Sequence, residues 1–151
     1  MDFSSYLSGF TDGEGCFSVS FNLRSKFSTG IEVRPSFSIS QHKRNLKLLN
    51  EIRDYFKAGG IRYSKRDGNY KYEVRSIKDL VQKVIPHFEK YPLKSNKLAD
   101  FLIFKEVCGL IFTSRHLNKK YLVKIIAMSY KMNESGKRKY KEEDLLKFLT
   151  R

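Results

Sequence analysis

Two stretches near the N-terminus alternate between apolar and polar residues, a period of two that is typical of a half-buried β-strand. The first stretch spans Phe17 to Arg24 and the second spans Ile31 to Ser40. The loop 25–30 between them is short, which predicts an antiparallel pair. Pro35 has no main-chain N–H to donate, so we expect a local edge or bulge in the second strand.

The hydrophobic period then becomes that of an α-helix. Apolar residues at helical spacing predict a helix over 44–57, which Gly59 and Gly60 would end. Alternating runs at 61–66 and 70–75 flank Asp67-Gly68, a dipeptide typical of a β-hairpin with a primed two-residue turn.

Four helices are predicted in the second half of the chain. The first starts near Ile77 and should end near Pro86, and the second, over 98–112, is apolar on nearly every face. We therefore expect this second helix to be the most buried one. A third helix carries Leu122, Ile125 and Ile126, and a short terminal helix is expected around 143–149.

This order of elements predicts an α+β fold in which helices cover one face of a four-stranded antiparallel sheet. The length of 151 residues favours one domain over 1–151, with a core over about 3–132 and a basic linker and terminal helix over 133–151. There is no βαβα alternation and no glycine-rich nucleotide loop in the sequence.

The uncovered face of this sheet should be rich in short hydroxyls, an amide and arginines, which hydrogen-bond base edges and phosphates in a DNA groove. An ordinary solvated sheet face would also be polar, but the excess of arginine here favours DNA. The expected DNA-contacting residues are Ser18, Ser20, Asn22, Arg24, Arg34, Ser36, Ser38, Ser40, Arg62, Ser64, Arg66, Lys71, Glu73 and Arg75.

Composition supports a polyanionic partner. Thirty Lys and Arg stand against sixteen Asp and Glu, a net charge of +14, while twelve Phe and nine Tyr indicate a folded protein rather than a disordered basic tail. The lysine-rich stretch Lys137 to Lys141 is read as a solvated or phosphate-contacting segment.

Few residues suggest chemistry of other kinds. Cys16 and Cys108 lack disulfide or zinc spacing and are expected to be buried thiols in a reducing compartment. His42, His87 and His116 are too widely spaced to form a ligand cluster or a nucleophile-base pair, so each is read as a surface or structural residue. We expect no membrane span and no signal peptide.

The most informative segment is Leu7 to Gly15, LSGFTDGEG, in a predicted N-terminal helix. Small residues recur every four positions at Ser5, Gly9 and Gly13, with Ser8 and Asp12 beside them, so a second helix could approach this face closely. Gly13 and Gly15 should release the helix and leave Glu14 at the junction with the first strand, where a carboxylate can hold a hard cation.

This segment resembles the motif of the LAGLIDADG homing endonucleases, at the expected place before an alternating strand. FSISQH (37–42) and HFEKYPLKSNKLADFLIFKE (87–106) also resemble segments of that family. The resemblance implies an αββαββα fold with added helices, whose sheet lies in the major groove of DNA.

The resemblance also implies roles for particular residues. Glu14 is the metal-binding acid, with the Gly13 carbonyl as a nearby ligand, and Gln41 lies near the active centre. Lys94 and Lys97 both fit the basic position, of which we favour Lys97. The expected cofactor is Mg²⁺; Mn²⁺ should substitute for it, and Ca²⁺ should occupy the site without supporting cleavage.

Only one such motif occurs, so the resemblance implies a homodimer with Ser5, Ser8, Gly9, Asp12 and Gly13 at its interface. The predicted function is metal-dependent, site-specific cleavage of double-stranded DNA at a long pseudo-palindromic target. The alternative is an intron-encoded RNA maturase that binds intron RNA and assists splicing. A DNA-binding regulator with an inactive site is disfavoured by Glu14. We expect an intracellular protein of an organelle (mitochondrion or chloroplast) or of a prokaryotic cytoplasm.

Overall fold

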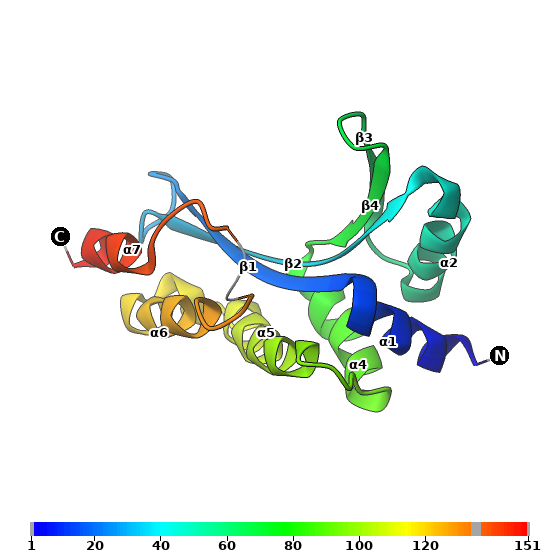
Figure 1. Ribbon diagram of the computed structural model, residues 1–151. Coiled ribbons are helices and arrows are strands. Elements are labelled where there is room, and N and C mark those ends of the chain that lie inside the picture. The colour runs from blue at the N-terminus through cyan, green and yellow to red at the C-terminus, as the bar shows by residue number, and fades with distance from the viewer. Residues whose placement is uncertain (1, 134–136, 151) are drawn as a thin grey trace. The chain divides into compact units, whose positions relative to one another are not determined.

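Four strands form a sheet in the order β1-β2-β4-β3 in the computed structural model, which describes residues 2–133 and 137–150 (Figure 1). Strands β2 and β4 pair antiparallel, as do β3 and β4. The α+β architecture predicted from the sequence is therefore confirmed.

The elements are α1 (Phe3–Glu14), β1 (Gly15–Leu23), β2 (Ile31–His42), the 3₁₀ turn η1 (Lys43–Asn45), α2 (Leu46–Phe56), β3 (Gly60–Ser64), β4 (Asn69–Val74), α3 (Ile77–Asp79), the π-helical turn η2 (Leu80–Val84), α4 (Ile85–Lys90), α5 (Lys97–Phe112), the 3₁₀ turn η3 (Arg115–Leu117), α6 (Lys119–Ser129) and α7 (Glu142–Leu149).

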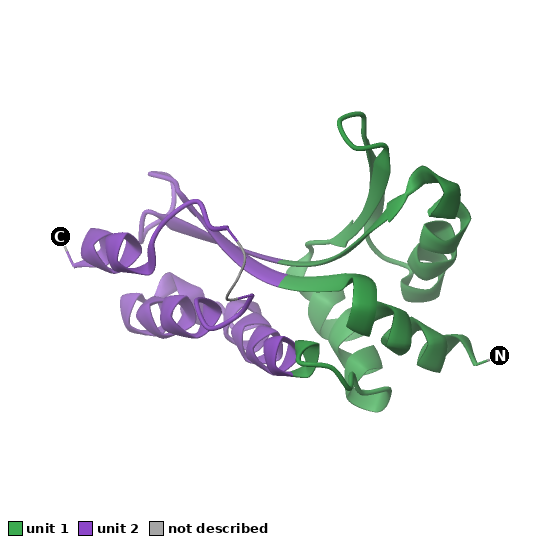
Figure 2. Cartoon of the chain, in the orientation of Figure 1, with its two compact units in different colours: residues 1–17, 36–98 green, residues 18–35, 99–151 purple. Residues whose placement is uncertain are grey.

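The chain divides into two compact units, shown in green and purple in Figure 2. Unit 1 contains residues 1–17 and 36–98, and unit 2 contains residues 18–35 and 99–151. Strands β1 and β2 therefore contribute residues to both units. The assignment of one domain over 1–151 stays a prediction from the sequence, and 134–136 of its expected linker lie outside the described residues.

Phe37 of β2 lies at the centre of the core of unit 1. Its ring centroid lies 5.1 Å from that of Phe17, 5.5 Å from Phe88, 5.9 Å from Phe56 and 6.4 Å from Tyr72. These rings come from β1, β2, β4, α2 and α4, so their burial joins strands and helices distant in sequence.

The core of unit 2 is built mainly from helices. Apolar residues of α5 and α6 are buried, and α7 contacts α6. The prediction that the helix over 98–112 is the most buried one is wrong: five of the 16 residues of α5 are buried, against four of 11 in α6, and Leu102 is 55% and Phe112 46% exposed. Only one side of α5 packs; apolar composition does not show how many neighbours a helix has.

The hairpin between β3 and β4 differs from its prediction. Ser64 pairs with Asn69, so the loop has four residues, and its Gly68 N–H donates to the Ser64 carbonyl. Gly68 has φ 70°, but Asp67 is not among the described residues of positive φ, which excludes the primed two-residue turn.

Pro86 does not end its helix, contrary to the sequence prediction. The chain stays helical from Ile77 to Lys90 because η2 intervenes, with the Ile85 N–H bonded to the Leu80 carbonyl five residues earlier. A proline disrupts the regular bond to the carbonyl four residues before it, and this wider turn accommodates that loss.

Three smaller predictions concern β1 and β2. Leu23, expected on the buried face, is exposed because it ends β1. Both cysteines were expected to be buried, which is confirmed for Cys108 and wrong for Cys16, whose side chain is exposed. Pro35 precedes Phe37, where the pairing of β2 with β4 begins, so it lies at the expected local edge of that pair. None of the helices described is both long and apolar enough to cross a bilayer.

Candidate functional site

Glu14 is the last residue of α1 and is exposed, directly before β1. Gly13 is still helical, so Gly15 alone makes the exit that both glycines were expected to make. Its N–H donates to the Thr11 carbonyl, and a Cβ at position 15 would lie 2.5 Å from Thr11 Cγ2. A side chain there would force α1 and β1 apart, so this glycine fixes where Glu14 is presented.

Lys97 lies at this junction. Its ammonium group donates to the main-chain carbonyl of Gly15, the residue after Glu14. Lys94, the other candidate, is exposed, and its main-chain N–H donates to the Asp12 carboxylate. Within unit 1, the geometry therefore brings Lys97 rather than Lys94 to the end of the motif.

Asp12 holds the segment that carries both lysines. Its carboxylate accepts from the N–H of Lys94 (2.9 Å), the N–H of Ser95 (3.0 Å) and the hydroxyl of Ser95 (2.7 Å). Partial burial opposes its ionisation, but these hydrogen bonds outweigh burial and hold the pKa of Asp12 below its ordinary value. Asp12 thus connects α1 to the start of α5 within one chain.

Gln41 lies near the end of β2, and its amide group is fixed. Its nitrogen donates to the Ser40 carbonyl (2.9 Å), and its oxygen accepts from the Asn45 side chain (2.8 Å). Asn45 was not singled out from the sequence, although its distance of four residues from Gln41 is that of neighbouring side chains on a turn of helix. The amide is held without a hydrogen bond to Glu14 or Lys97 among the bonds described.

The donor atoms at the end of α1 fit a hard divalent cation. The Glu14 carboxylate and main-chain carbonyls such as that of Gly13 are oxygen donors, and a helix C-terminus carries partial negative charge. Among the described residues, however, no group of three or more His, Cys, Asp or Glu side chains comes together. The end of α1 therefore supplies one exposed carboxylate, that of Glu14.

The small residues of α1 lie on two different faces. Ser5, Gly9 and Gly13 are exposed, and a Cβ at Gly9 or Gly13 would meet nothing within 4 Å. Ser8 is buried and donates to the Tyr91 carbonyl at 2.6 Å, and Asp12 is bonded as above. Of the five residues expected at a dimer interface, only Ser5, Gly9 and Gly13 leave a surface that another helix could approach.

In unit 1, Glu73 of β4 organises the polar face of the sheet. It accepts from the Ser36 hydroxyl at 2.5 Å and pairs with Arg62 at 3.3 Å and with Lys71 at 3.6 Å. Ser36 and Ser38, expected on an open face, are only 7% and 8% exposed, because neighbouring strands shield short side chains in the middle of a sheet. The other expected contacts here are exposed: Ser40, Ser64, Arg66 and Arg75.

In unit 2, Arg24 and Glu32 form an ion pair of 3.5 Å, while Ser20 is exposed and Ser18, Asn22 and Arg34 are half-buried. The basic C-terminal segment adjoins these residues. Lys139 donates to the Asn22 side chain at 3.3 Å. This neighbour of the expected reading face could not be placed from the sequence.

Arg138 is the anchor of that segment. It donates to the carbonyls of Val19 (2.7 Å) and Ser129 (2.6 Å), and its guanidinium lies 4.3 Å from the ring centroid of Tyr130. Lys137, Lys139 and Lys141, which alternate with Arg138 and Tyr140, are exposed. In the sequence, the signal for this difference is the alternation of Arg138 and Tyr140 with the three lysines.

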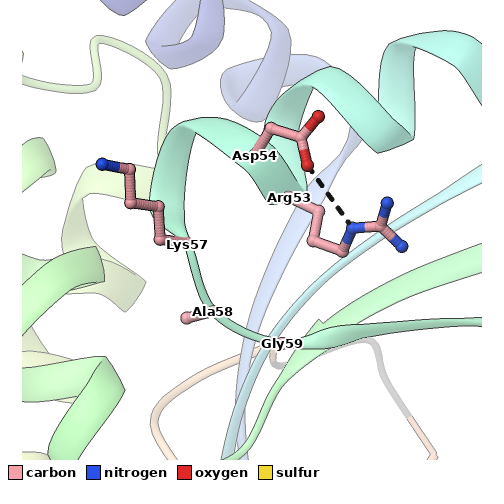
Figure 3. Close-up of a pocket in the computed structure, with 5 residues that line it drawn as sticks. All are labelled: Arg53, Asp54, Lys57, Ala58 and Gly59. Carbon is pink, nitrogen blue, oxygen red and sulfur yellow. Dashed lines mark ion pairs between the residues drawn. The ribbon is translucent and has the colours of Figure 1, made fainter.

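A pocket also lies at the end of α2, lined by Arg53, Asp54, Lys57, Ala58 and Gly59 (Figure 3). Arg53 and Asp54 form an ion pair at 3.7 Å, and the Lys57 side chain extends away from both. None of the motif residues lines it, so the chemistry-bearing site remains at the end of α1.

A family model described as "LAGLIDADG endonuclease" matches residues 7–108. A probable intron-encoded DNA endonuclease of Mycosarcoma maydis is 32% identical over 133 residues, which cover 88% of this chain and 47% of that protein. Across four intron-associated relatives, the chain spans 24% to 47% of their length.

Two solved structures show the same fold. The homing endonuclease I-TnaI matches with a TM-score of 0.84 and 35% identity, over 97% of this chain and 95% of that one. I-SmaMI, bound to an uncleaved DNA target in the presence of calcium ions, matches with a TM-score of 0.87 and 32% identity, over 98% of this chain and 49% of that one.

Proposed function

This chain belongs to the LAGLIDADG endonuclease family, and on that basis we propose that it cuts double-stranded DNA at specific sites. The observation that carries the proposal is the contact of Lys97 with the main-chain carbonyl of Gly15, which brings a cation to the residue that follows the exposed Glu14. Two relatives are described as probable intron-encoded endonucleases, so the RNA maturase alternative is not favoured. An intron-encoded enzyme would act within the organelle or cell that carries its gene.

The active form would be a homodimer joined through α1. Gly9 and Gly13 present open backbone to a second helix, and each chain would bring one Glu14 to a shared centre. The coverage supports two copies, since one copy matches nearly all of I-TnaI but about half of I-SmaMI. Two Glu14 carboxylates, one from each copy, would then contribute metal ligands at that centre.

The residues at the end of α1 would hold Mg²⁺ through the Glu14 carboxylates and the Gly13 carbonyls. Such an ion, when bound, acidifies a water molecule and stabilises the leaving oxygen of a phosphodiester. Lys97 would offset negative charge that develops on the phosphate. The Gln41 amide, held by Asn45 and the Ser40 carbonyl, would orient a water molecule or a phosphate oxygen.

Binding of DNA would use the polar side chains of the sheet, supported by the net charge of +14. In unit 1 the pairs that Glu73 makes with Arg62 and Lys71 would hold these cations in place before DNA arrives. In unit 2 the reading residues would include Asn22, Arg24 and Arg34. Each of the two copies in the homodimer would read one half of a pseudo-palindromic target.

The test is incubation of the full-length chain with a library of randomised DNA duplexes and Mg²⁺, followed by sequencing of the cut ends. We expect a long recognition site whose two halves are related by two-fold symmetry. A folded, DNA-binding protein that cuts no duplex in Mg²⁺ or Mn²⁺ would overturn the proposal. Cleavage at a site without related halves would overturn the homodimer.

A further inference from the structure

One continuous chain of hydrogen bonds in unit 1 joins α1 to α2 and α4. The Ser4 hydroxyl lies 2.9 Å from the Tyr55 hydroxyl, which lies 2.8 Å from His87 Nδ1. His87 Nε2 lies 3.0 Å from the Ser8 hydroxyl, which donates to the Tyr91 carbonyl at 2.6 Å. We call these five groups the His87 relay. Of the five residues only Ser8 lies in the LSGFTDGEG motif, and none of them lies at the end of α1 where Glu14 is presented.

Every proton of the His87 relay can be placed by elimination. A carbonyl only accepts, so the single hydroxyl proton of Ser8 is directed to Tyr91. His87 Nε2 must then carry a proton and donate it to Ser8. In a neutral ring Nδ1 is an acceptor, so Tyr55 donates to it, and Ser4 donates to Tyr55.

The surroundings of His87 keep the ring neutral. The residue is only 6% exposed, and burial lowers its pKa to about 4, although the charge of Asp2 opposes this change. At neutral pH both ring nitrogens therefore have one fixed partner each. The relay runs in one direction, from Ser4 to the Tyr91 carbonyl.

The His87 relay is hydrogen-bonded to α1 at two residues about one helical turn apart. Ser4 and Ser8 both lie in α1, whose buried residues are Leu7, Ser8 and Thr11. Leu7 is the one large apolar side chain among these three, and apolar contacts are not directional. Hydrogen bonds have preferred directions, so those of Ser4 and Ser8, together with those of Asp12, set how α1 is rotated about its axis.

We propose that the His87 relay positions α1 and, through this rigid helix, the carboxylate of Glu14. Glu14 lies six residues after Ser8, about 9 Å along the same helix at 1.5 Å per residue. A small rotation of α1 at Ser8 therefore moves Glu14 relative to its counterpart in the second copy. Tyr55, His87 and Ser8 are positioning residues, and this role rests on the proposed function.

Two matched substitutions in unit 1 test this role. Tyr55→Phe removes the hydroxyl that joins Ser4 to His87 and keeps the ring. Tyr72→Phe also removes one hydroxyl, which donates to the Ala58 carbonyl at 2.7 Å, but this bond does not involve α1. Each variant is compared with the wild type for Tm, for DNA affinity and for single-turnover cleavage of a duplex recovered from the library. Exchange of the α1 backbone amides with deuterium is measured in parallel.

Misplacement of a reacting group by about 1 Å costs about a hundredfold in rate, so we expect Tyr55→Phe to cleave at least about tenfold more slowly while DNA affinity changes by less than about twofold. Amides of α1 should exchange faster in that variant only. Equal losses of cleavage in the two variants, or wild-type cleavage by Tyr55→Phe, would overturn the proposal.

If the wild type cuts no DNA, the proposed function fails by itself, and the exchange measurement then decides whether the relay holds α1. Unchanged α1 exchange in Tyr55→Phe would overturn that role as well. As a second spectroscopic measure, ¹⁵N NMR of the ring should show His87 protonated at Nε2; a ring protonated at Nδ1 would contradict the direction of the relay.

Discussion

The ammonium group of Lys97 donates to the main-chain carbonyl of Gly15, although the two residues are 82 positions apart in the sequence. The contact brings the start of α5 to the junction of α1 and β1, within unit 1. It involves Lys97, the lysine that the sequence favours of the two that fit the family pattern.

Replacement of Lys97 by Met should therefore lower the cleavage rate by about a hundredfold, the usual effect of removing one stabilising cation or donor from a catalytic site. Lys94→Met is the matched control, since the Lys94 side chain is exposed, and it should leave the rate nearly unchanged. The measurement is single-turnover cleavage in Mg²⁺. A larger effect of Lys94→Met would reverse the assignment.

Glu14→Gln should abolish cleavage and leave DNA affinity nearly unchanged, because it removes a charged metal ligand at the end of α1 and does not alter the polar face of the sheet. Affinity is measured by titration of labelled duplex, and cleavage is measured in parallel in Mg²⁺. Ca²⁺ should support binding without cleavage by the wild type. If Glu14→Gln cut at the wild-type rate, the catalytic metal would have to lie elsewhere.

Gly9→Leu should shift the protein from dimer to monomer. A Cβ at this exposed position would meet nothing within 4 Å, so we expect the variant to fold while a second helix could no longer approach closely. Sedimentation velocity gives the mass of each form, and Tm checks that the variant is folded. A wild type that is monomeric at micromolar concentration and on DNA would contradict the proposed dimer.

Arg34→Ala and Lys139→Ala should separate base recognition from phosphate binding within unit 2. Loss of Arg34 should relax the preference at one position of each half-site by about 1 to 3 kcal/mol. Loss of Lys139 should weaken binding to all sequences. It should also lower the slope of log affinity against log salt concentration by about one unit, the effect of losing one phosphate contact. Profiling of all single-base target variants at two salt concentrations distinguishes the two results. If Arg34→Ala leaves base preference unaltered at every position, Arg34 does not read the target.

Stability should fall as the solution becomes more acidic through the range in which His87 titrates. Its pKa is about 4 in the folded chain, below the ordinary 6.5, so the unfolded chain binds the extra proton first. The stabilising contribution is complete above pH 6.5 and is lost as the pH falls towards 4. His87→Gln, which cannot titrate, should show a smaller change between pH 7 and pH 5 in urea unfolding. An identical change in both proteins would show that His87 is not responsible.

Periodicity alone predicted β1, β2, α2 and α6 closely, because the residues that alternate or repeat in these segments are those that pack. It failed where the outcome depended on a neighbour or on main-chain hydrogen bonds. Pro86 stays within a helical segment because a π-helical turn precedes it, and Leu102 is exposed because no described element covers that side of α5.

The sequence by itself determined the family and its acidic residue Glu14, since LSGFTDGEG is a run of consecutive residues that can be identified without knowledge of tertiary contacts. Only the tertiary structure shows that the Lys97 ammonium contacts the Gly15 carbonyl, which small residues of α1 remain exposed, and that His87 joins three helices. These relationships depend on side chains separated by tens of residues, whose distances are fixed when the core packs. A single sequence records the residues but not those distances.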